Sequence, residues 1–181
     1  MKNHCVLFPL FLLICMMLTG CSKDEKEFSI DFNFQLRTVE GDSSHGFGYG
    51  DNIVFDLEII NNSDFDVTYG PNDADVVLDD ELFRVYSKDG REIGLPWTGM
   101  YCEFSGQQYW TIPAKSVKHV ICPWFQCESA SPSHPLCKAV DNPLLSVGDY
   151  YTRFSVSYNH SSNRSQKLMS KKVFQMDFRV Q

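Results

Sequence analysis

Alternation of apolar and polar residues with a period of two constrains the fold of this chain more than any other feature. Residues 28–37 alternate without interruption, and every second position is apolar: Phe28, Ile30, Phe32, Phe34 and Leu36. Successive side chains of a β-strand point to opposite faces, so this pattern predicts a half-buried strand. Residues 52–60 predict a second strand, with Asp56 and Glu58 on the polar face and an apolar face made by Ile53, Phe55, Leu57 and Ile59.

Turn signals divide the following residues into further short strands. The sequence from Asn61 to Asp64 is typical of a turn, because Asn and Asp tolerate left-handed backbone and bond neighbouring amides, and it leads into a strand expected at 65–69. Lys88-Asp89-Gly90 predicts a hairpin between strands at 82–87 and 91–95, because Gly accepts the positive φ of a hairpin turn.

A second hairpin and a final pair of strands complete the pattern. Pro113-Ala114-Lys115-Ser116 predicts a hairpin between 107–112 and 117–125 in the same way, and strands at 150–158 and 168–180 form the last pair. Residues 41–50 and 71–81 are expected to be loops.

About nine strands, separated by turns at intervals of roughly 8–12 residues, predict an all-β sandwich or barrel. The composition agrees, since 8 Tyr and 14 Phe suit a pleated sheet and 11 Gly and 8 Pro suit turns. No segment is periodic enough to predict a long helix.

Residues 1–20 have the layout of a bacterial lipoprotein signal peptide. Lys2 precedes an uncharged stretch at 5–18, which is shorter than the roughly 20 apolar residues of a membrane span. Leu18-Thr19-Gly20-Cys21 resembles the lipobox, which implies cleavage before Cys21 and attachment of a diacylglyceryl group and an N-acyl chain such as palmitate. Such lipids are sufficient for stable anchoring. The alternative is an ordinary signal peptide with a chance cysteine.

Residues 21–27 predict a lipidated cysteine followed by a polar tether, and residues 28–181 predict a single β-sandwich domain. Ser22 after the cysteine is expected of outer-membrane sorting, and Lys23-Asp24-Glu25 resembles the surface-export signal of Bacteroidetes lipoproteins. The expected location is the outer membrane, at the cell surface, with a periplasm-facing orientation as the alternative.

Four motifs resemble the Bacillus-type intracellular proteinase inhibitor family. They are residues 53–63, residues 83–93 with their Asp-Gly turn, the proline turn at 112–116, and Gly148-Asp149-Tyr150 within 147–151. This resemblance implies an immunoglobulin-like antiparallel sandwich of about seven to nine strands, and proteinase inhibition as an alternative function. Tyr150 also resembles the tyrosine corner of sandwich folds, in which the phenol bonds backbone at a sheet corner. The family's usual Gly in the proline turn is Ala114 here, and the insertion at 126–143 has no counterpart.

The mature chain retains four cysteines besides Cys21, in a compartment that favours disulfides. They allow three pairings. We expect Cys127 to pair with Cys137, because this bridge would order a polar, Pro- and Ser-rich insertion, and Cys102 to pair with Cys122. A zinc site is the alternative, but it lacks a Cys-x-x-Cys motif and would need His119 or His134 at irregular spacing.

No pattern typical of catalysis, of a cofactor or of a resident metal occurs in the chain. The net charge of -7 argues against nucleic acid. The Gly-rich residues 46–50 lie between two strands and do not open a helix, which excludes a phosphate loop. The acidic residues Asp73, Asp75, Asp79, Asp80 and Glu81 lack the spacing of an EF-hand and are expected to be solvated rather than to bind calcium. A hydrolase would need a His and a carboxylate converging in a cleft.

Exposed aromatic residues are the remaining candidate for a binding patch. Trp97 and Tyr101 lie in a predicted loop, near Tyr109, whereas Trp110 and Trp124 fall within alternating strands and are expected in the core. The sequence therefore predicts a lipid-anchored, non-enzymatic binding module, with the membrane as one partner through Cys21 and a protein or glycan ligand as the other.

Overall fold

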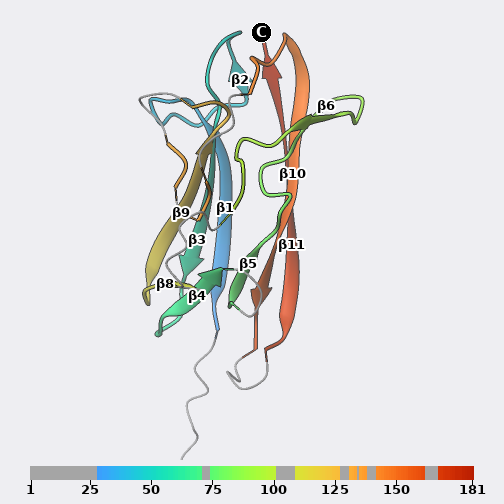
Figure 1. Ribbon diagram of the computed structural model, residues 1–181. Helices are drawn as coiled ribbons and strands as arrows, with labels where there is room; N and C mark the ends of the chain where they lie inside the picture. The colour runs from blue at the N-terminus through green and yellow to red at the C-terminus, as the bar shows by residue number, and fades with distance from the viewer. Residues whose placement is uncertain are drawn as a thin grey trace, which may run out of the picture.

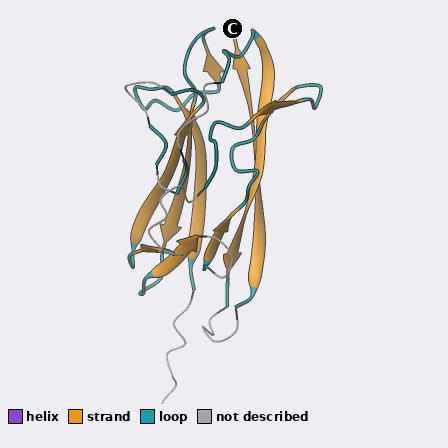
Figure 2. Ribbon diagram, in the orientation of Figure 1, coloured by secondary structure: helices purple, strands orange, loops and turns teal. Residues whose placement is uncertain are grey.

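Two β-sheets pack face to face along the length of the molecule, as Figure 1 shows. The computed structural model describes residues 28–70, 74–100, 109–126, 131–133, 135–137, 142–161 and 167–181. These residues form strands and loops and contain no helix, so none of their segments is a helix that could cross a membrane (Figure 2). The prediction of an all-β sandwich is confirmed.

The smaller sheet has three antiparallel strands in the order β1-β3-β9. They are β1 (Ile30–Arg37), β3 (Val54–Asn61) and β9 (Ser116–Pro123). Apolar residues at alternate positions meet across this sheet, as in the pairs Phe34↔Leu57 and Leu36↔Phe55. The period of two in the sequence therefore places one apolar face of the small sheet against the core.

The larger sheet has eight strands, with a main path in the order β2-β11-β10-β5-β4-β8 and with β6 and β7 extending from β10. They are β2 (Gly46–Phe47), β4 (Val67–Gly70), β5 (Val76–Leu78), β6 (Val85–Ser87), β7 (Glu92–Gly94), β8 (Trp110–Ile112), β10 (Gly148–Asn159) and β11 (Met169–Val180). The predicted pairing of the last two strands is confirmed, and β10 and β11 match over 12 residue pairs without a shift. The predicted hairpin at Gly90 is confirmed as well, since β6 pairs with β7.

Aromatic rings from both sheets fill the space between them. The ring of Phe34 in β1 lies 4.9 Å from that of Phe154 in β10, and both contact Phe83, at 5.8 and 5.2 Å between ring centroids. Phe83 comes from the loop before β6 and is fully buried. Edge-to-face and offset pairs of this kind add about 1 kcal/mol each to the free energy of burial.

Two segments predicted to be loops contain strands. β5 lies within 71–81 and pairs with β10 through Val156↔Leu78, and β2 lies within 41–50 and pairs with β11 through Val180↔Phe47. Both strands are three residues or shorter. Their partners are distant in the sequence, so no local periodicity marks them.

The second predicted hairpin is wrong, because its two strands belong to different sheets. β8 pairs with β4 in the large sheet, and β9 pairs with β3 in the small sheet. The proline turn at 113–116 therefore carries the chain from one sheet to the other. Its Lys115 has a positive φ of 53°, a conformation unusual for a residue other than Gly, Asn or Asp.

Asn61 ties this crossing to the end of β3. Its side-chain amide donates to the carbonyl oxygens of Phe65, Ile112 and Pro113 at 2.9, 3.1 and 2.9 Å, and its Oδ1 accepts from the Ser63 amide at 3.0 Å. The predicted asparagine turn is therefore confirmed. The fully buried side chain satisfies backbone groups that water cannot reach.

Tyr150 lies at the start of β10 and closes a corner of the large sheet. Its hydroxyl donates to the carbonyl oxygen of Ser146 at 2.8 Å, and its ring stacks on Phe178 at 5.5 Å. The predicted bond from this phenol to the backbone is confirmed.

We expect Asn61→Ala to lower the free energy of unfolding by about 3 kcal/mol, because it leaves buried carbonyl groups without donors. The neighbouring Asn62→Ala is the matched control. Asn62 is exposed and its side-chain amide donates to Asp31 Oδ2 at 3.0 Å, so this change should stay within about 0.5 kcal/mol. Urea denaturation of the two variants measures the difference, and equal losses would contradict the role assigned to Asn61.

Candidate functional site

The predicted aromatic patch does not form as expected, because Trp97 is part of the core. Its side chain is 7% exposed, and its indole Nε1 donates to the carbonyl oxygen of Leu82 at 2.7 Å. Tyr109 is half-buried, and Tyr101 lies outside the described residues. Trp124 is buried as expected. The loop position of Trp97 suggested exposure, but its partner is a distant backbone carbonyl that only the fold supplies.

One of the two predicted disulfides, Cys102 with Cys122, does not form. Cys122 is a free thiol in the core, and its Sγ donates to the carbonyl oxygen of Pro96 at 3.3 Å, so a pairing with Cys102 is wrong. The alternating position of Cys122 in β9 points its side chain inward. Cys137 is disulfide-bonded, but Cys127 and Cys102 lie outside the described residues, as does Cys21. The pairing of Cys127 with Cys137 therefore stays a prediction.

The described part of the insertion at 126–143 packs on the sandwich. Leu136 is buried and pairs with Met100 in an isolated bridge. The Ser133 amide donates to the carbonyl oxygen of Ile121 at 2.8 Å, and Ser133 Oγ accepts from the Ile121 amide at 2.6 Å. Ser133 thus continues the hydrogen bonding of the small sheet beyond β9.

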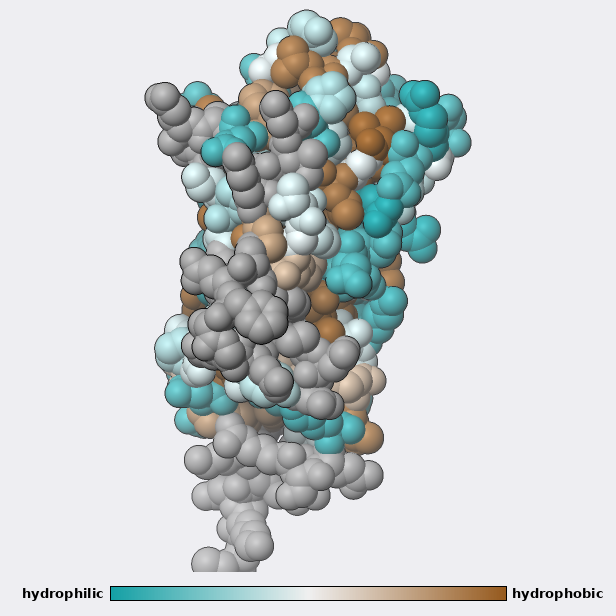
Figure 3. Space-filling model, viewed as in Figure 1, coloured by the Kyte–Doolittle hydropathy of each residue, from teal (hydrophilic) through white to brown (hydrophobic). Residues whose placement is uncertain are grey.

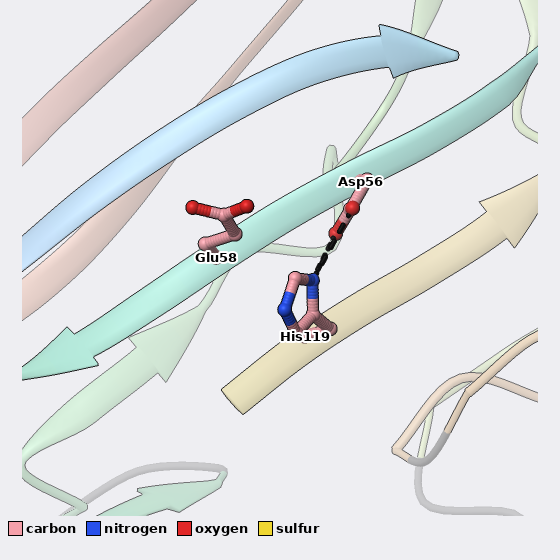
Figure 4. A group of neighbouring side chains, drawn as sticks. All are labelled: Asp56, Glu58 and His119. Carbon is pink, nitrogen blue, oxygen red and sulfur yellow. Dashed lines mark hydrogen bonds and ion pairs between the residues drawn. The ribbon is translucent and has the colours of Figure 1, made fainter. Parts of the chain in front are cut away.

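A charged cluster on the outer face of the small sheet was not expected. Asp56 in β3 is on the predicted polar face, yet its side chain is only 2% exposed. His119 in β9 covers it from one side, with Nδ1 3.0 Å from Asp56 Oδ1 (Figure 4). Arg37 in β1 covers it from the other side, with Nε 3.1 Å from Asp56 Oδ2.

Glu58 extends this cluster along the same face of β3. Its Oε1 accepts from the Arg37 guanidinium at 3.3 Å, and its Oε2 accepts from the Asn33 side-chain amide at 3.1 Å. Arg37 therefore bridges two carboxylates that are two residues apart. The sequence signal was available, since alternation places Asp56 and Glu58 on one face, but the burial depends on side chains from the neighbouring strands.

Asp56, Glu58 and His119 are also the described residues whose donor atoms lie close enough to hold a metal, within 4.8 Å of one another. However, Arg37 already supplies positive charge to both carboxylates. The alternative zinc site that the sequence suggested would use His119 together with cysteines. In the structure, His119 Nδ1 contacts the Asp56 carboxylate instead. His134, its other candidate ligand, lies outside the described residues.

The cluster also bears on the hydrolase alternative, which requires a His and a carboxylate to converge. His119 and Asp56 do converge, but on a sheet face, and neither residue lines either of the two grooves described below. A buried carboxylate held by Arg37 is engaged in charge pairing. We assign no catalytic step to this pair.

A groove of about 360 Å³ runs along the outer face of the large sheet, between residues 79–86 and strands β10 and β11. The rings of Tyr86 and Tyr151 stack at 5.1 Å along its wall. Burial raises the pKa of the Tyr86 hydroxyl above its usual value. Groups of both charge signs also line this outer groove: Asp79, Glu81, Arg153 and Lys171.

The acidic residues that lead into this groove are held by neighbouring groups. Asp75 Oδ2 accepts from the Thr68 amide and hydroxyl, both at 2.8 Å, and Oδ1 lies 3.5 Å from Lys167 Nζ. Asp79 accepts from Ser155 Oγ at 2.8 Å and lies 3.7 Å from Lys171 Nζ. Lysine ammonium groups thus stand beside two of the five carboxylates that the calcium alternative invoked. Asp73, another of the five, lies outside the described residues.

A second groove of similar volume lies near the C terminus and β2, at the upper end in Figure 1. Its charged residues are Lys88, Asp149, Asp177 and Arg179, and His45 lies beside them. Arg179 Nε lies 2.6 Å from Asp149 Oδ1, and this hydrogen bond lowers the pKa of the Asp149 carboxyl. Figure 3 shows hydrophobic residues reaching the surface at the same end of the molecule, beside the hydrophilic β6–β7 hairpin.

Comparison with known proteins finds no family model that matches this chain, and no curated protein or solved structure that matches it.

We expect Cys122 to resist alkylation in the folded protein. Burial raises the pKa of its thiol, so the reactive thiolate is scarce at neutral and mildly alkaline pH, and the core blocks the reagent. Peptide mapping after iodoacetamide treatment should find Cys122 unmodified in native protein and modified after denaturation without reductant. Cys137 is the internal control, since its disulfide should prevent modification until a reductant is added. Modification of Cys122 in the native state would contradict its buried position.

We expect Asp56→Ala to lower the free energy of unfolding by about 3 kcal/mol, because it removes the buried one of the two carboxylates that pair with the half-buried Arg37 guanidinium. Glu58→Ala is the comparison on the same strand. Its side chain is more exposed, at 19%, so the loss should be about 1 kcal/mol. Denaturant titration of both variants tests this order, and a larger loss for Glu58→Ala would reverse our assignment.

Proposed function

We propose that this protein is a lipid-anchored protein of the bacterial cell envelope, whose immunoglobulin-like β-sandwich acts as a non-enzymatic binding module. The observation that carries the proposal is the order of parts along the chain: an apolar leader, Leu18-Thr19-Gly20-Cys21, a short polar stretch, and then the first strand. Lipid on Cys21 would hold the domain at the outer membrane of a Bacteroidetes-like bacterium, at the cell surface.

The position of β1 supports presentation of the domain away from the membrane. β1 begins at the lower end of the sandwich, whereas the C terminus and β2 lie at the upper end (Figure 1). A tether that precedes Phe28 therefore attaches at one end. The outer faces of both sheets and the opposite end are then accessible to a ligand.

The outer groove is the surface that best suits recognition. Aromatic rings from Tyr86 and Tyr151 lie beside carboxylates and cations in a groove of about 360 Å³. Aromatic residues and arginine are the residues that contribute most at binding surfaces. This surface replaces the patch of Trp97, Tyr101 and Tyr109 in the proposal, with a protein or a glycan as the ligand and with no nucleic acid or cofactor.

The immunoglobulin-like assignment within the sandwich class is supported by the Tyr150 corner, whose phenol reaches the backbone four residues upstream. The eleven strands of the described residues exceed the seven to nine expected. Five of them, β2, β5, β6, β7 and β8, are three residues or shorter, and all five belong to the large sheet. We therefore propose an immunoglobulin-like sandwich whose large sheet carries additional short strands.

Proteinase inhibition is the alternative that the family resemblance implies. It requires a protruding loop that occupies a protease cleft, and residues 96–106 and 127–137 are the candidate loops. Residues 101–106, 127–130 and 134 lie outside the described residues, and two residues of the described part, Trp97 and Leu136, are buried. We therefore retain the binding module as the main proposal.

Replacement of the lipidation site tests the anchor. We expect Cys21→Ser to leave an uncleaved precursor, as globomycin should for the wild-type chain, because signal removal depends on the modified thiol. Protease added to intact cells should then degrade the wild-type domain while a periplasmic marker survives. Cys5→Ser, within the leader, is the matched control and should be processed normally. Normal processing of Cys21→Ser would overturn the lipoprotein proposal, and protection from external protease would assign the domain to the periplasmic side.

Ligand screening separates the two functions. The full-length lipoprotein, purified in detergent, is applied to a glycan array and assayed against a panel of serine proteases. Binding that is lost in Arg153→Ala but kept in Arg91→Ala, an exposed arginine outside the groove lining, would support the outer groove. Inhibition of a protease would favour the alternative function instead.

A further inference from the structure

The C-terminal strand β11 has one edge that is mostly unpaired in the part of the chain that the structure describes. The amide of His160 donates to the carbonyl oxygen of Leu168 at 2.9 Å. This bond shows which residue pairs of the antiparallel β10–β11 ladder are hydrogen-bonded and which are not. Even-numbered residues of β11 therefore direct their backbone groups to β10, and odd-numbered residues direct theirs away from it. Consistent with this phase, the Arg179 amide donates outward to the carbonyl oxygen of His45 in front of β2.

Along the part of β11 that precedes its pairing with β2, the backbone groups that point away from β10 have no hydrogen-bond partner among the described residues. They belong to Met169, Lys171, Val173 and Gln175, together with the amide of Asp177. The carbonyl oxygen of Asp177 faces Nδ1 of His45 at 3.1 Å. An unpaired edge of this length is a template for another strand.

The edge of β9 in the small sheet is capped. Ser133 exchanges hydrogen bonds with Ile121 at 2.6 and 2.8 Å, and its hydroxyl also reaches the carbonyl oxygen of His119 at 3.3 Å. A further strand cannot pair with β9 at these positions without displacing Ser133.

The edge of β1 is capped as well. The Ser44 amide donates to the carbonyl oxygen of Leu36 at 2.9 Å. Lys172 points inward from β11, donates to the carbonyl oxygen of Phe32 at 3.3 Å, and lies over the rings of Phe32 and Phe174 at 5.6 and 5.5 Å. The Lys172 ammonium therefore satisfies an outward carbonyl oxygen on the edge of β1. The open stretch of β11 contrasts with both capped edges.

We propose that residues 169–177 of β11 pair antiparallel with the same residues of a second copy of this chain. The open stretch begins with β11 at Met169 and ends at Asp177, where the pairing with β2 takes over. Its central residue is Val173. A two-fold axis at this centre places Val173 opposite Val173 of the second copy. Each odd-numbered residue then meets an odd-numbered residue, so the outward amides and carbonyls of both strands become paired.

The side chains suit this register. Val173 is 56% exposed and gains an apolar neighbour of its own kind at the axis. Lys171 lies opposite Gln175 of the second copy and diagonal to its Asp177, within reach of a lysine side chain. On the outer face, no two like charges are directly opposite in the five pairs that the register creates. A second copy is therefore complementary to this edge in backbone, shape and charge.

The axis is perpendicular to the strands, so the two Phe28 ends lie at opposite ends of the paired sheets. Two copies anchored in the same membrane can pair if their strands run parallel to the membrane surface. Two copies anchored in membranes that face each other can pair if their strands run perpendicular to those surfaces. The inference does not rest on the proposed binding function or on the anchor. Lys171 and Val173 also line the outer groove, so self-association is measured in the absence of any ligand.

Cysteine cross-linking tests the register. Directly opposite residues of a hydrogen-bonded pair have Cα atoms about 5.5 Å apart, which suits a disulfide. Cells producing full-length Val173→Cys are oxidised with copper phenanthroline, and a covalent dimer is expected on a non-reducing gel. Lys171→Cys and Gln175→Cys should cross-link to each other when produced together, and poorly when produced alone.

Wild-type protein and Val147→Cys are the controls. Wild type reports cross-links through the native cysteines. Val147 is more exposed than Val173, at 67%, and lies before β10, so its cysteine should remain monomeric. Equal cross-linking of Val147→Cys and Val173→Cys would indicate random collision and overturn the proposal.

The mass of the full-length protein in detergent provides a second measurement. Sedimentation should give a dimer for wild type and a monomer for Val173→Lys, because the substitution places two like charges opposite each other at the axis. Val173→Lys should still unfold cooperatively, since residue 173 faces solvent in the single chain, and its midpoint should fall only by what loss of the dimer accounts for. A monomeric wild type over the tested concentrations, or dimerisation retained in Val173→Lys, would exclude this interface.

Discussion

The packing of alternating aromatic side chains between the two sheets is the interaction on which the rest of the structure depends. Phe34 from the small sheet meets Phe83 and Phe154 from the other side of the core, and burial of each such ring contributes about 2 kcal/mol. This layer holds β1 against β10 and β11. The outer faces of both sheets, with the charged cluster and the outer groove, are positioned by it.

The crossing between the sheets is the second constraint, because it decides which strands share a sheet. The chain leaves β8 in the large sheet and enters β9 in the small sheet within one proline turn, and buried Asn61 bonds both sides of that turn. A local hairpin at this point would leave β3 without β9. It would also separate Asp56 from His119, so the charged cluster exists only because the turn crosses.

The two outer faces differ in chemistry. On the small sheet, Arg37 and His119 enclose Asp56, and the Arg37 guanidinium pairs with its carboxylate. On the large sheet, the outer groove keeps tyrosine rings and groups of both signs at a surface that a ligand can reach. The first arrangement stabilises the sheet, whereas the second suits recognition. The edges differ as well: other segments bond outward backbone groups of β1 and β9, whereas residues 169–175 of β11 have no such partner among the described residues.

Local patterns in the sequence determined the long strands, the Gly90 hairpin, the asparagine turn and the Tyr150 corner, because each depends on side-chain alternation or on turn chemistry within a few residues. Tertiary structure alone decided four other features: the short strands β2 and β5, the sheet to which β8 belongs, the burial of Trp97 and the free state of Cys122. In each case the deciding contact joins residues far apart in the chain, such as Trp97 with Leu82 or Val156 with Leu78. The same holds for Asp56: alternation put it on the outer face, and only the pairing of three strands brought Arg37 and His119 over it, because the burial of a charge depends on the neighbours that the fold supplies.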